Sequence, residues 1–162
     1  MVIRFYNTYT KKKELFKPIN KNEVTLYTCG PTVYKPIHLG NARTFLIEDL
    51  LRRHLEFSGF KVKQVMNITD VGHLTRDDIE AGEDKIQAEA RRKKVTPKQI
   101  AEVNEKDFYA QMKQLNVLKA YKYPRATDHI KEMQDWIKKL LKNKLAYEVN
   151  GSVYFDISRF KN

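Results

Sequence analysis

The chain has 162 residues, enough for one domain with a hydrophobic core, and 31% of them are charged. The net charge of +11 favours a polyanionic partner such as nucleic acid. No apolar run approaches the roughly 20 residues of a membrane-spanning helix, and no signal peptide is recognisable. A single cysteine, Cys29, cannot form an internal disulfide, so we expect a cytoplasmic protein without membrane contacts.

Much of the positive charge is concentrated in three runs, at residues 11–13, 91–94 and 138–144. One such run by itself is commonly a solvated helix face. The total charge is harder to explain in that way, because basic patches attract polyanions through counterion release. The charge therefore favours a nucleic-acid partner.

The first elements in chain order predict a βαβ unit. Residues 24–28 are apolar and predict a buried strand, and the apolar stripe over residues 40–58 predicts a helix that ends before Gly59. Alternation over residues 60–66 predicts a second strand. Strand, helix and strand in this order form a parallel pair, so we expect an α/β fold.

Two helices are predicted next. A charged helix is expected over residues 84–94, and Thr96-Pro97-Lys98-Gln99 is a capping box with proline at the first helical position. The helix that starts there has an apolar face, which consists of Ala101, Phe108, Met112 and Leu115.

The rest of the chain predicts a break, a helix and a hairpin. The break is at residues 121–124, and a helix is expected over residues 128–142, with Trp136 as a packing residue. A hairpin over residues 145–156 is centred on Asn150-Gly151, a strong two-residue turn signal. The helical residues expected to point inward are Ile130, Met133, Ile137 and Leu140 or Leu141.

The segment His38-Leu39-Gly40-Asn41 connects the first strand to the first helix, where α/β proteins bind nucleotides. His38 and Asn41 are three residues apart at the helix N-terminus, so both can donate hydrogen bonds to phosphate oxygens. Gly40 has no side chain, which would let a base or ribose approach the backbone. A structural role is the alternative, with His38 capping the helix.

Several segments together resemble one enzyme family. They are L-Y-T-C-G-P-T-V-Y at residues 26–34, H-L-G-N-A-R-T at 38–44, M-N-I-T-D at 66–70, E-D-K at 83–85, P-R-A-T-D-H-I at 124–130 and G-S-V-Y-F-D at 151–156. This set is similar to the class I aminoacyl-tRNA synthetases and, within them, to the cysteinyl-tRNA synthetases. The resemblance runs along almost the whole chain and covers only the amino-terminal part of such an enzyme.

The resemblance implies the first half of a Rossmann-like parallel-sheet nucleotide-binding domain over residues 1–120. Residues 121–162 would begin an α+β insertion that is incomplete here. The K-M-S-K-S loop, the second half of the sheet and the anticodon-binding domain of that family are absent from the sequence. We therefore expect a fragment that binds ATP weakly and cannot charge tRNA. Cysteine-dependent ATP–pyrophosphate exchange by the chain would contradict this expectation.

The resemblance also implies a reaction. ATP, with Mg²⁺, would activate L-cysteine to cysteinyl-adenylate, and the cysteinyl group would pass to tRNA(Cys). His38 and Asn41 would be the catalytic residues, stabilising charge on the phosphate oxygens. The residues implied to bind the nucleotide are Gly30, Pro31, Thr32, His38, Gly40, Asn41, Thr44, Asn67, Ile68 and Thr69.

Cys29 is implied to be one ligand of a Zn²⁺ that binds the substrate thiolate, with one ion per complete site and the other ligands outside this chain. A metal–thiolate bond distinguishes cysteine from serine, which differs by one atom. Without the resemblance, Cys29 would be a small buried apolar residue. His54, His73 and His129 show no metal-ligand spacing with it, although His73 could approach a substrate.

Two other functions remain open. A ligase that passes the cysteinyl group to an amino sugar in thiol biosynthesis would share the roles of Cys29 and His38, and AMP release with cysteine and an amino sugar, but without a response to tRNA, would identify it. A non-catalytic RNA-binding module of the same fold would bind RNA in a salt-sensitive way. His38→Ala or Asn41→Ala would leave that RNA binding unchanged.

Overall fold

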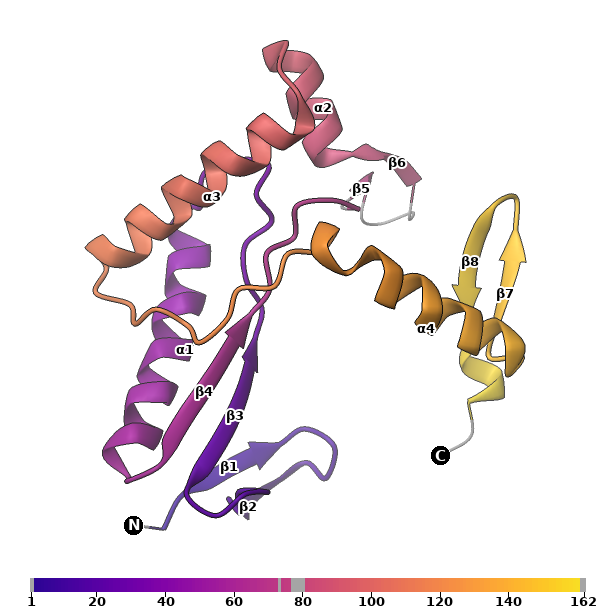
Figure 1. Cartoon of the computed structure of the whole chain (residues 1–162). Coiled ribbons are helices and arrows are strands. Elements are labelled where there is room, and N and C mark those ends of the chain that lie inside the picture. The colour runs from indigo at the N-terminus through magenta and orange to yellow at the C-terminus, as the bar shows by residue number, and fades with distance from the viewer. Residues whose placement is uncertain (1, 73, 77–80, 161–162) are drawn as a thin grey trace. The chain divides into compact units, whose positions relative to one another are not determined.

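The computed structural model describes residues 2–72, 74–76 and 81–160. The chain divides into two compact units, Met1–Pro124 and Arg125–Asn162, whose elements are labelled in Figure 1. The first unit contains β1 (Arg4–Asn7), β2 (Lys12–Leu15), β3 (Glu23–Thr28), α1 (Leu39–Phe57), β4 (Lys61–Met66), β5 (Leu74–Arg76), β6 (Ala81–Asp84), α2 (Lys85–Lys93) and α3 (Pro97–Gln114). The second contains η1 (Thr127–His129), α4 (Ile130–Lys142), β7 (Ala146–Val149), β8 (Ser152–Phe155) and η2 (Ile157–Arg159). No helix in the described part of the chain combines the length and apolar composition needed to cross a membrane.

A parallel βαβ unit forms the centre of the first unit. β3 pairs with β4 along the full length of both strands, and α1 connects them and lies alongside (Figure 1). α1 begins after the N-cap residue His38 and ends at Phe57, with Ser58 as its C-cap, and Gly59 follows with φ of +91°. This arrangement confirms the predicted strand, helix, strand order and the α/β class.

Two buried clusters hold the helices against the strand pair. Leu55 of α1 packs with Val24 and Val62 on the two strands. Phe45 of α1 packs with α3, whose Phe108 ring lies 5.4 Å from the Phe45 ring. The predicted apolar face of α3 is buried at Ala101, Phe108 and Met112, whereas Leu115, just beyond the end of α3, is 38% exposed.

The predicted break at residues 121–124 is an extended segment that hydrogen-bonds to β4 and to the residues after it. The Tyr121 N–H donates to the Gln64 carbonyl at 2.8 Å, and the Ile68 N–H donates to the Pro124 carbonyl at 2.8 Å. A stretch this short has no readable alternation, and its pairing partner is distant in sequence. The sequence pattern therefore identified the interruption of the helices but not the pairing.

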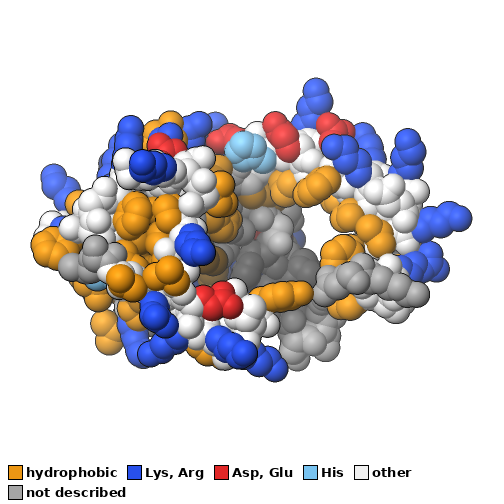
Figure 2. Space-filling view, turned by 90° about the horizontal axis from the view of Figure 1, so that it is seen from below, with side chains coloured by type: hydrophobic (Ala, Val, Ile, Leu, Met, Phe, Trp, Pro, Cys, Tyr) orange, Lys and Arg blue, Asp and Glu red, His pale blue; other side chains and the backbone are white. Residues whose placement is uncertain are grey.

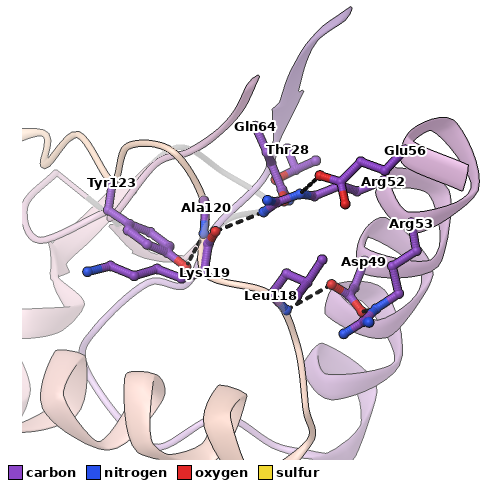
Figure 3. A network of polar contacts seen from close by, with 10 residues as sticks. All are labelled: Thr28, Asp49, Arg52, Arg53, Glu56, Gln64, Leu118, Lys119, Ala120 and Tyr123. Carbon is purple, nitrogen blue, oxygen red and sulfur yellow. Dashed lines mark hydrogen bonds and ion pairs between the residues drawn. The ribbon is translucent and has the colours of Figure 1, made fainter. Parts of the chain in front are cut away.

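Charged side chains of α1 hold the loop that precedes this segment (Figure 3). The carboxylate of Asp49, which is 6% exposed, accepts hydrogen bonds from the Leu118 N–H at 2.8 Å and from Nε of Arg53 at 2.6 Å. Arg52 donates to the Lys119 carbonyl at 2.8 Å. Buried polar groups need such partners, so the helix and the loop stabilise each other.

Glu48 on α1 is half-buried, and one of its two carboxyl oxygens is withdrawn from solvent. Its Oε2 has no hydrogen-bond partner among the described residues. Burial raises the pKa of Glu48, and a hydrogen bond from Thr28 opposes this more weakly. The Thr28 hydroxyl also accepts a hydrogen bond from Nε2 of Gln64 at 3.1 Å, which links α1 to both strands.

An N-terminal hairpin, β1 with β2, was not predicted from the sequence. The ring of Phe5 lies 5.2 Å from that of Phe16, which in turn lies 5.9 Å from the ring of Phe60, so the hairpin is attached to the core. Its turn, residues 8–11, contains no glycine or proline, and Lys11 adopts the positive φ of 57°. The usual turn signals were therefore missing. The strand pair β5 and β6 was likewise not predicted.

The second unit contains the predicted hairpin. β7 and β8 are antiparallel, and Asn150 and Gly151 between them have φ of 52° and 79°, as a two-residue turn requires. This confirms the turn signal in the sequence.

The helix of the second unit differs from the prediction. α4 has no buried residue, and the inward orientation predicted for Ile130, Met133 and Ile137 is wrong because all three are exposed, whereas Leu140 and Leu141 are half-buried. The packing role predicted for Trp136 is also wrong, since its side chain is 65% exposed. One helix and a two-stranded hairpin offer too little surface to cover an apolar helix face.

The Asp49 contacts predict a stability effect. Asp49→Ala should lower the free energy of unfolding by about 2 kcal/mol, because the Leu118 N–H and Arg53 lose a charged acceptor. Urea unfolding followed by circular dichroism measures it. The control is Glu102→Ala, which removes an exposed pair with Lys98 at 3.8 Å and should cost less than about 0.5 kcal/mol. Equal losses in both variants would contradict the role given to Asp49.

The raised pKa of Glu48 predicts a pH-dependent effect. Because folding raises the pKa of Glu48, the protonated carboxyl stabilises the fold. This contribution is fully present at pH values below the unfolded-state pKa and is lost as pH rises through the folded-state pKa. Glu48→Gln should therefore be more stable than the wild type at pH 7, and this difference should shrink as pH falls towards 4.5, the ordinary glutamate value. Thermal unfolding of both proteins over this range measures it. A pH-independent difference would count against it, and exposed Glu102→Gln serves as the control.

Candidate functional site

A cleft of about 290 Å³ opens where β3 leads into α1. It lies at the carboxyl end of a parallel strand and at the N-terminus of the following helix, which is where α/β proteins bind nucleotides. Its lining consists of Cys29, Gly30, Pro31, Thr32, Tyr34, Lys35, Pro36, Ile37, His38 and Asn41.

His38 and Asn41 form a reciprocal capping box at the start of α1. Nδ1 of His38 accepts a hydrogen bond from the Gly40 N–H at 3.1 Å. Oδ1 of Asn41 accepts one from the His38 N–H at 3.1 Å. Two of the unpaired N–H groups at the helix start are thereby satisfied. The structural alternative weighed for His38, helix capping, is thus present.

The capping bonds determine which atoms of the two side chains can meet a ligand. Because Nδ1 of His38 accepts, the neutral imidazole carries its proton on Nε2. Because Oδ1 of Asn41 accepts, the atom left for a ligand is the amide Nδ2. Both remaining groups are donors, and the N-terminus of the 19-residue helix favours a negative charge nearby. Capping and anion binding are therefore compatible here.

Gly40 makes room for the capping ring. A Cβ at this position would lie 2.9 Å from Cε1 and 3.1 Å from Nδ1 of His38, so a larger residue would displace the imidazole. This role adds to the access for a nucleotide that the sequence suggested. Thr44, one turn later, donates its hydroxyl to the Gly40 carbonyl at 3.4 Å and does not line the cleft.

The backbones that follow β3 and β4 approach each other closely at Gly30. A Cβ on Gly30 would lie only 1.7 Å from the carbonyl oxygen of Asn67, so no side chain fits there. Oδ1 of Asn67 accepts hydrogen bonds from the Gly30 N–H and from the Tyr27 hydroxyl, each at 3.1 Å. Nδ2 of Asn67 donates to Oγ1 of Thr69 at 3.1 Å. The Asn67 side chain thus holds the two strand ends together.

The pairing continues beyond the strands. Thr32 and Thr69 form a parallel bridge, and the Thr69 N–H donates to the Pro31 carbonyl at 3.0 Å. Ile68, which precedes Thr69, has no exposed surface, and its N–H donates to the Pro124 carbonyl, so it offers no free group to a ligand in this structure. Of the residues implied for the nucleotide, the cleft is lined by Gly30, Pro31, Thr32, His38 and Asn41, whereas Gly40, Thr44, Asn67, Ile68 and Thr69 lie outside that lining.

Tyr34 and Lys35 line the cleft but were missed from the sequence. Nζ of Lys35 lies 5.0 Å and Nζ of Lys85 lies 5.8 Å from the centre of the Tyr34 ring, within the range of cation–π attraction. Lys35 therefore adds an exposed positive charge to the cleft lining. A usable signal was present, because Lys35 lies only three residues before His38 in the sequence and carries a positive charge.

Cys29 is exposed, and its Sγ lies 3.8 Å from the Gly30 carbonyl oxygen. The exposure contradicts the alternative of a buried packing residue. Zn²⁺ needs about three protein ligands, and no group of three His, Cys, Asp or Glu suited to a metal occurs in the described ranges. His73 lies outside the described residues. The residues present thus fit one zinc ligand and not a complete site, so the ligand role of Cys29 stays a prediction.

Comparison with known proteins agrees with this geometry. The family model described as "tRNA synthetases class I (C) catalytic domain" matches residues 15–162. The cysteine–tRNA ligase of Chlorobium chlorochromatii is 44% identical over 99% of the chain and 33% of its own length. That of Thermococcus onnurineus is 44% identical over 100% of the chain and 32% of its own length. The chain therefore spans about a third of the curated relatives that it matches.

A solved structure supports the fold. The crystal structure titled as the ternary complex of Agrobacterium radiobacter K84 agnB2 LeuRS-tRNA-LeuAMS matches with a TM-score of 0.63, over 81% of this chain and 16% of that chain. At 17% identity this likeness concerns the fold alone, and it confirms the predicted Rossmann-like α/β class. Because the family model covers nearly all of the sequence, the chain belongs to the family of class I (C) tRNA synthetase catalytic domains.

Proposed function

We propose that the cleft is the nucleotide-binding part of a cysteine–tRNA ligase active site. The observation that carries the proposal is the capping box, which leaves Nε2 of His38 and Nδ2 of Asn41 as donors at the carboxyl end of a parallel strand pair. Relatives named cysteine–tRNA ligase match nearly the whole chain and support L-cysteine and tRNA(Cys) as the other substrates. They favour tRNA over an amino sugar as the acceptor.

The proposed reaction needs positioning more than acid–base chemistry. The cysteine carboxylate would attack the α-phosphorus of ATP, forming an O–P bond while the bond to pyrophosphate breaks and its electron pair leaves with pyrophosphate. No strong base is required, because the carboxylate is already nucleophilic. Negative charge grows on the phosphate oxygens, where His38 and Asn41 would donate hydrogen bonds. Mg²⁺ would accompany the ATP phosphates.

The cap makes these two donors rigid. Each side chain uses one of its polar atoms on the backbone at 3.1 Å, so neither loses much freedom when a phosphate arrives. Asn67 would be a positioning residue that acts through its neighbours, because its polar atoms bond to Tyr27, Gly30 and Thr69 and hold the two strand ends together. Cys29 would contribute one ligand to a zinc site whose other ligands lie outside the described residues.

For this chain alone, we propose that it binds ATP weakly and does not charge tRNA. Its cleft of about 290 Å³ falls just below the roughly 300–1,000 Å³ of ordinary ligand pockets. A partial cleft leaves more of a nucleotide in water. Cysteine-dependent ATP–pyrophosphate exchange by the purified chain would overturn this part of the proposal.

His38→Asn separates the capping role from the phosphate role. Asparagine is a favoured N-cap, so the free energy of unfolding should stay within about 0.5 kcal/mol of the wild type. It cannot place a donor where Nε2 lies, so ATP affinity should fall about tenfold, as expected for one hydrogen bond to a charged group. Isothermal titration with ATP and urea unfolding measure the two quantities.

Two variants control this experiment. His38→Ala removes both functions, so it should lose about 1 kcal/mol of stability as well as ATP affinity. His54→Asn makes the same substitution at an exposed position near the end of α1, away from the cleft lining, and should bind ATP as the wild type does. Unchanged ATP affinity in His38→Asn would contradict the proposed donor.

The exposure of Cys29 predicts its reactivity. Ellman's reagent should label the thiol in the folded chain about as fast as in urea, since the side chain is accessible. One equivalent of Zn²⁺ should give little protection, because one thiolate alone binds zinc weakly. Absorbance of the released thiolate gives the rate. Full protection by stoichiometric Zn²⁺ would show that further ligands exist within the chain.

A further inference from the structure

The N-terminal segment concentrates positive charge away from the cleft. Residues 1–22 contain one acidic residue, Glu14, and six basic residues, namely Arg4, Lys11, Lys12, Lys13, Lys17 and Lys21. Six minus one gives +5 of the chain's +11. The cleft lining includes none of these residues. A charge excess of this kind attracts a polyanion.

One face of the β1–β2 hairpin holds the acidic group. Phe5 lies opposite Glu14 in the register, and Asn7 is on the same face because side chains alternate along a strand. The Glu14 carboxylate accepts hydrogen bonds from Thr10 at 2.6 Å and from Asn7 at 2.9 Å, and these lower its pKa. Phe5 attaches this face to the core through Phe16. The acid is therefore partnered and on the attached face.

The opposite face is basic and aromatic. Tyr6 lies directly opposite Lys13, and Arg4, two residues before Tyr6, lies on the same face opposite Leu15. Tyr6 is 60% exposed, and Tyr9 in the turn is 85% exposed. Within the described ranges, the side chains of Arg4 and Lys13 form no ion pair and no hydrogen bond. Figure 2, seen from the side on which β1 and β2 lie in Figure 1, shows Lys and Arg side chains beside exposed hydrophobic ones.

We propose that this hairpin surface, which consists of Arg4, Tyr6 and Lys13 on one strand face together with Tyr9 and Lys11 in the turn, binds a single-stranded segment of RNA. The cations would contact successive backbone phosphates, and the two exposed phenol rings would stack on bases. Stacking requires bases that are not already paired inside a duplex, so the chemistry favours a single strand over a double helix. The site is separate from the ATP cleft, and its binding does not depend on the proposed reaction.

The test measures the affinity of the whole chain for a fluorescent single-stranded uridine oligonucleotide by anisotropy, over a range of salt concentrations. The triple variant Arg4→Gln, Lys11→Gln, Lys13→Gln should weaken binding more than tenfold. It should also lower the salt slope by about 2, at about 0.7 per lost phosphate contact on a single strand. Tyr6→Ala should weaken binding at least fivefold, whereas Tyr6→Phe, which keeps the ring, should bind as the wild type does.

Matched controls come from the second unit. The triple variant Lys138→Gln, Lys139→Gln, Lys142→Gln removes the same charge from α4 and should change affinity less than threefold. Trp136→Ala removes another exposed aromatic ring and should have no effect. If either control weakens binding as much as the hairpin variants do, the proposal is overturned. His38→Asn should bind RNA normally, which separates this proposal from that for the cleft.

Other outcomes also decide the matter. If a duplex of equal length binds as tightly as the single strand, or if Tyr6→Ala and Tyr9→Ala both bind normally, stacking is refuted and the proposal fails. The proposal also fails if the chain binds vesicles of phosphatidylserine and phosphatidylcholine in a way that depends on Tyr6, and does not bind the RNA. Circular dichroism checks folding. If Tyr6→Ala unfolds, Tyr9→Ala replaces it, because the Tyr9 ring lies in the turn and is nearly free of contacts.

Discussion

The close approach of the Gly30 and Asn67 backbones is the constraint on which the rest of the first unit depends. It brings the chain after β3 against the chain after β4, at a distance that no Cβ allows. Asn67 then bonds to Tyr27, Gly30 and Thr69, and the Thr32–Thr69 bridge extends the pairing. The turn that follows is thereby fixed in direction. It delivers the chain to the capping box at the start of α1, and the cleft is the space between these features.

α1 contributes to the site through contacts at its start and in its middle. Its first residues present donors to the cleft, while Asp49 and Arg52, further along, bond to the backbone of the loop before residues 121–124. That segment pairs with β4 and with Ile68, immediately beside Asn67. α1 therefore supports the site in two ways. Its N-terminal end contacts the cleft directly, and its middle holds the loop that leads into the segment paired with β4.

Features with local signals could be predicted from the sequence, and features that depend on distant partners could not. The end of the helix at Gly59 and the turn at Asn150-Gly151 could be predicted, because the positive φ values at these positions favour glycine and asparagine. The pairing of residues 121–124 and the β1–β2 hairpin depend on contacts between segments without a turn signal. In the site, His38 and Asn41 were predicted as donors from their spacing. Their mutual bonding, which selects the donating atoms, and the place of Tyr34 and Lys35 in the lining required coordinates.

The cap also links the residue at position 40 to the residue at position 38. A Cβ on Gly40 would lie 2.9 Å from Cε1 of His38, whose Nδ1 accepts the Gly40 N–H. A side chain at position 40 would therefore move the ring and weaken the bond that caps the helix. The two positions act as one structural unit, so the effects of substituting them on the stability of the helix start are not additive.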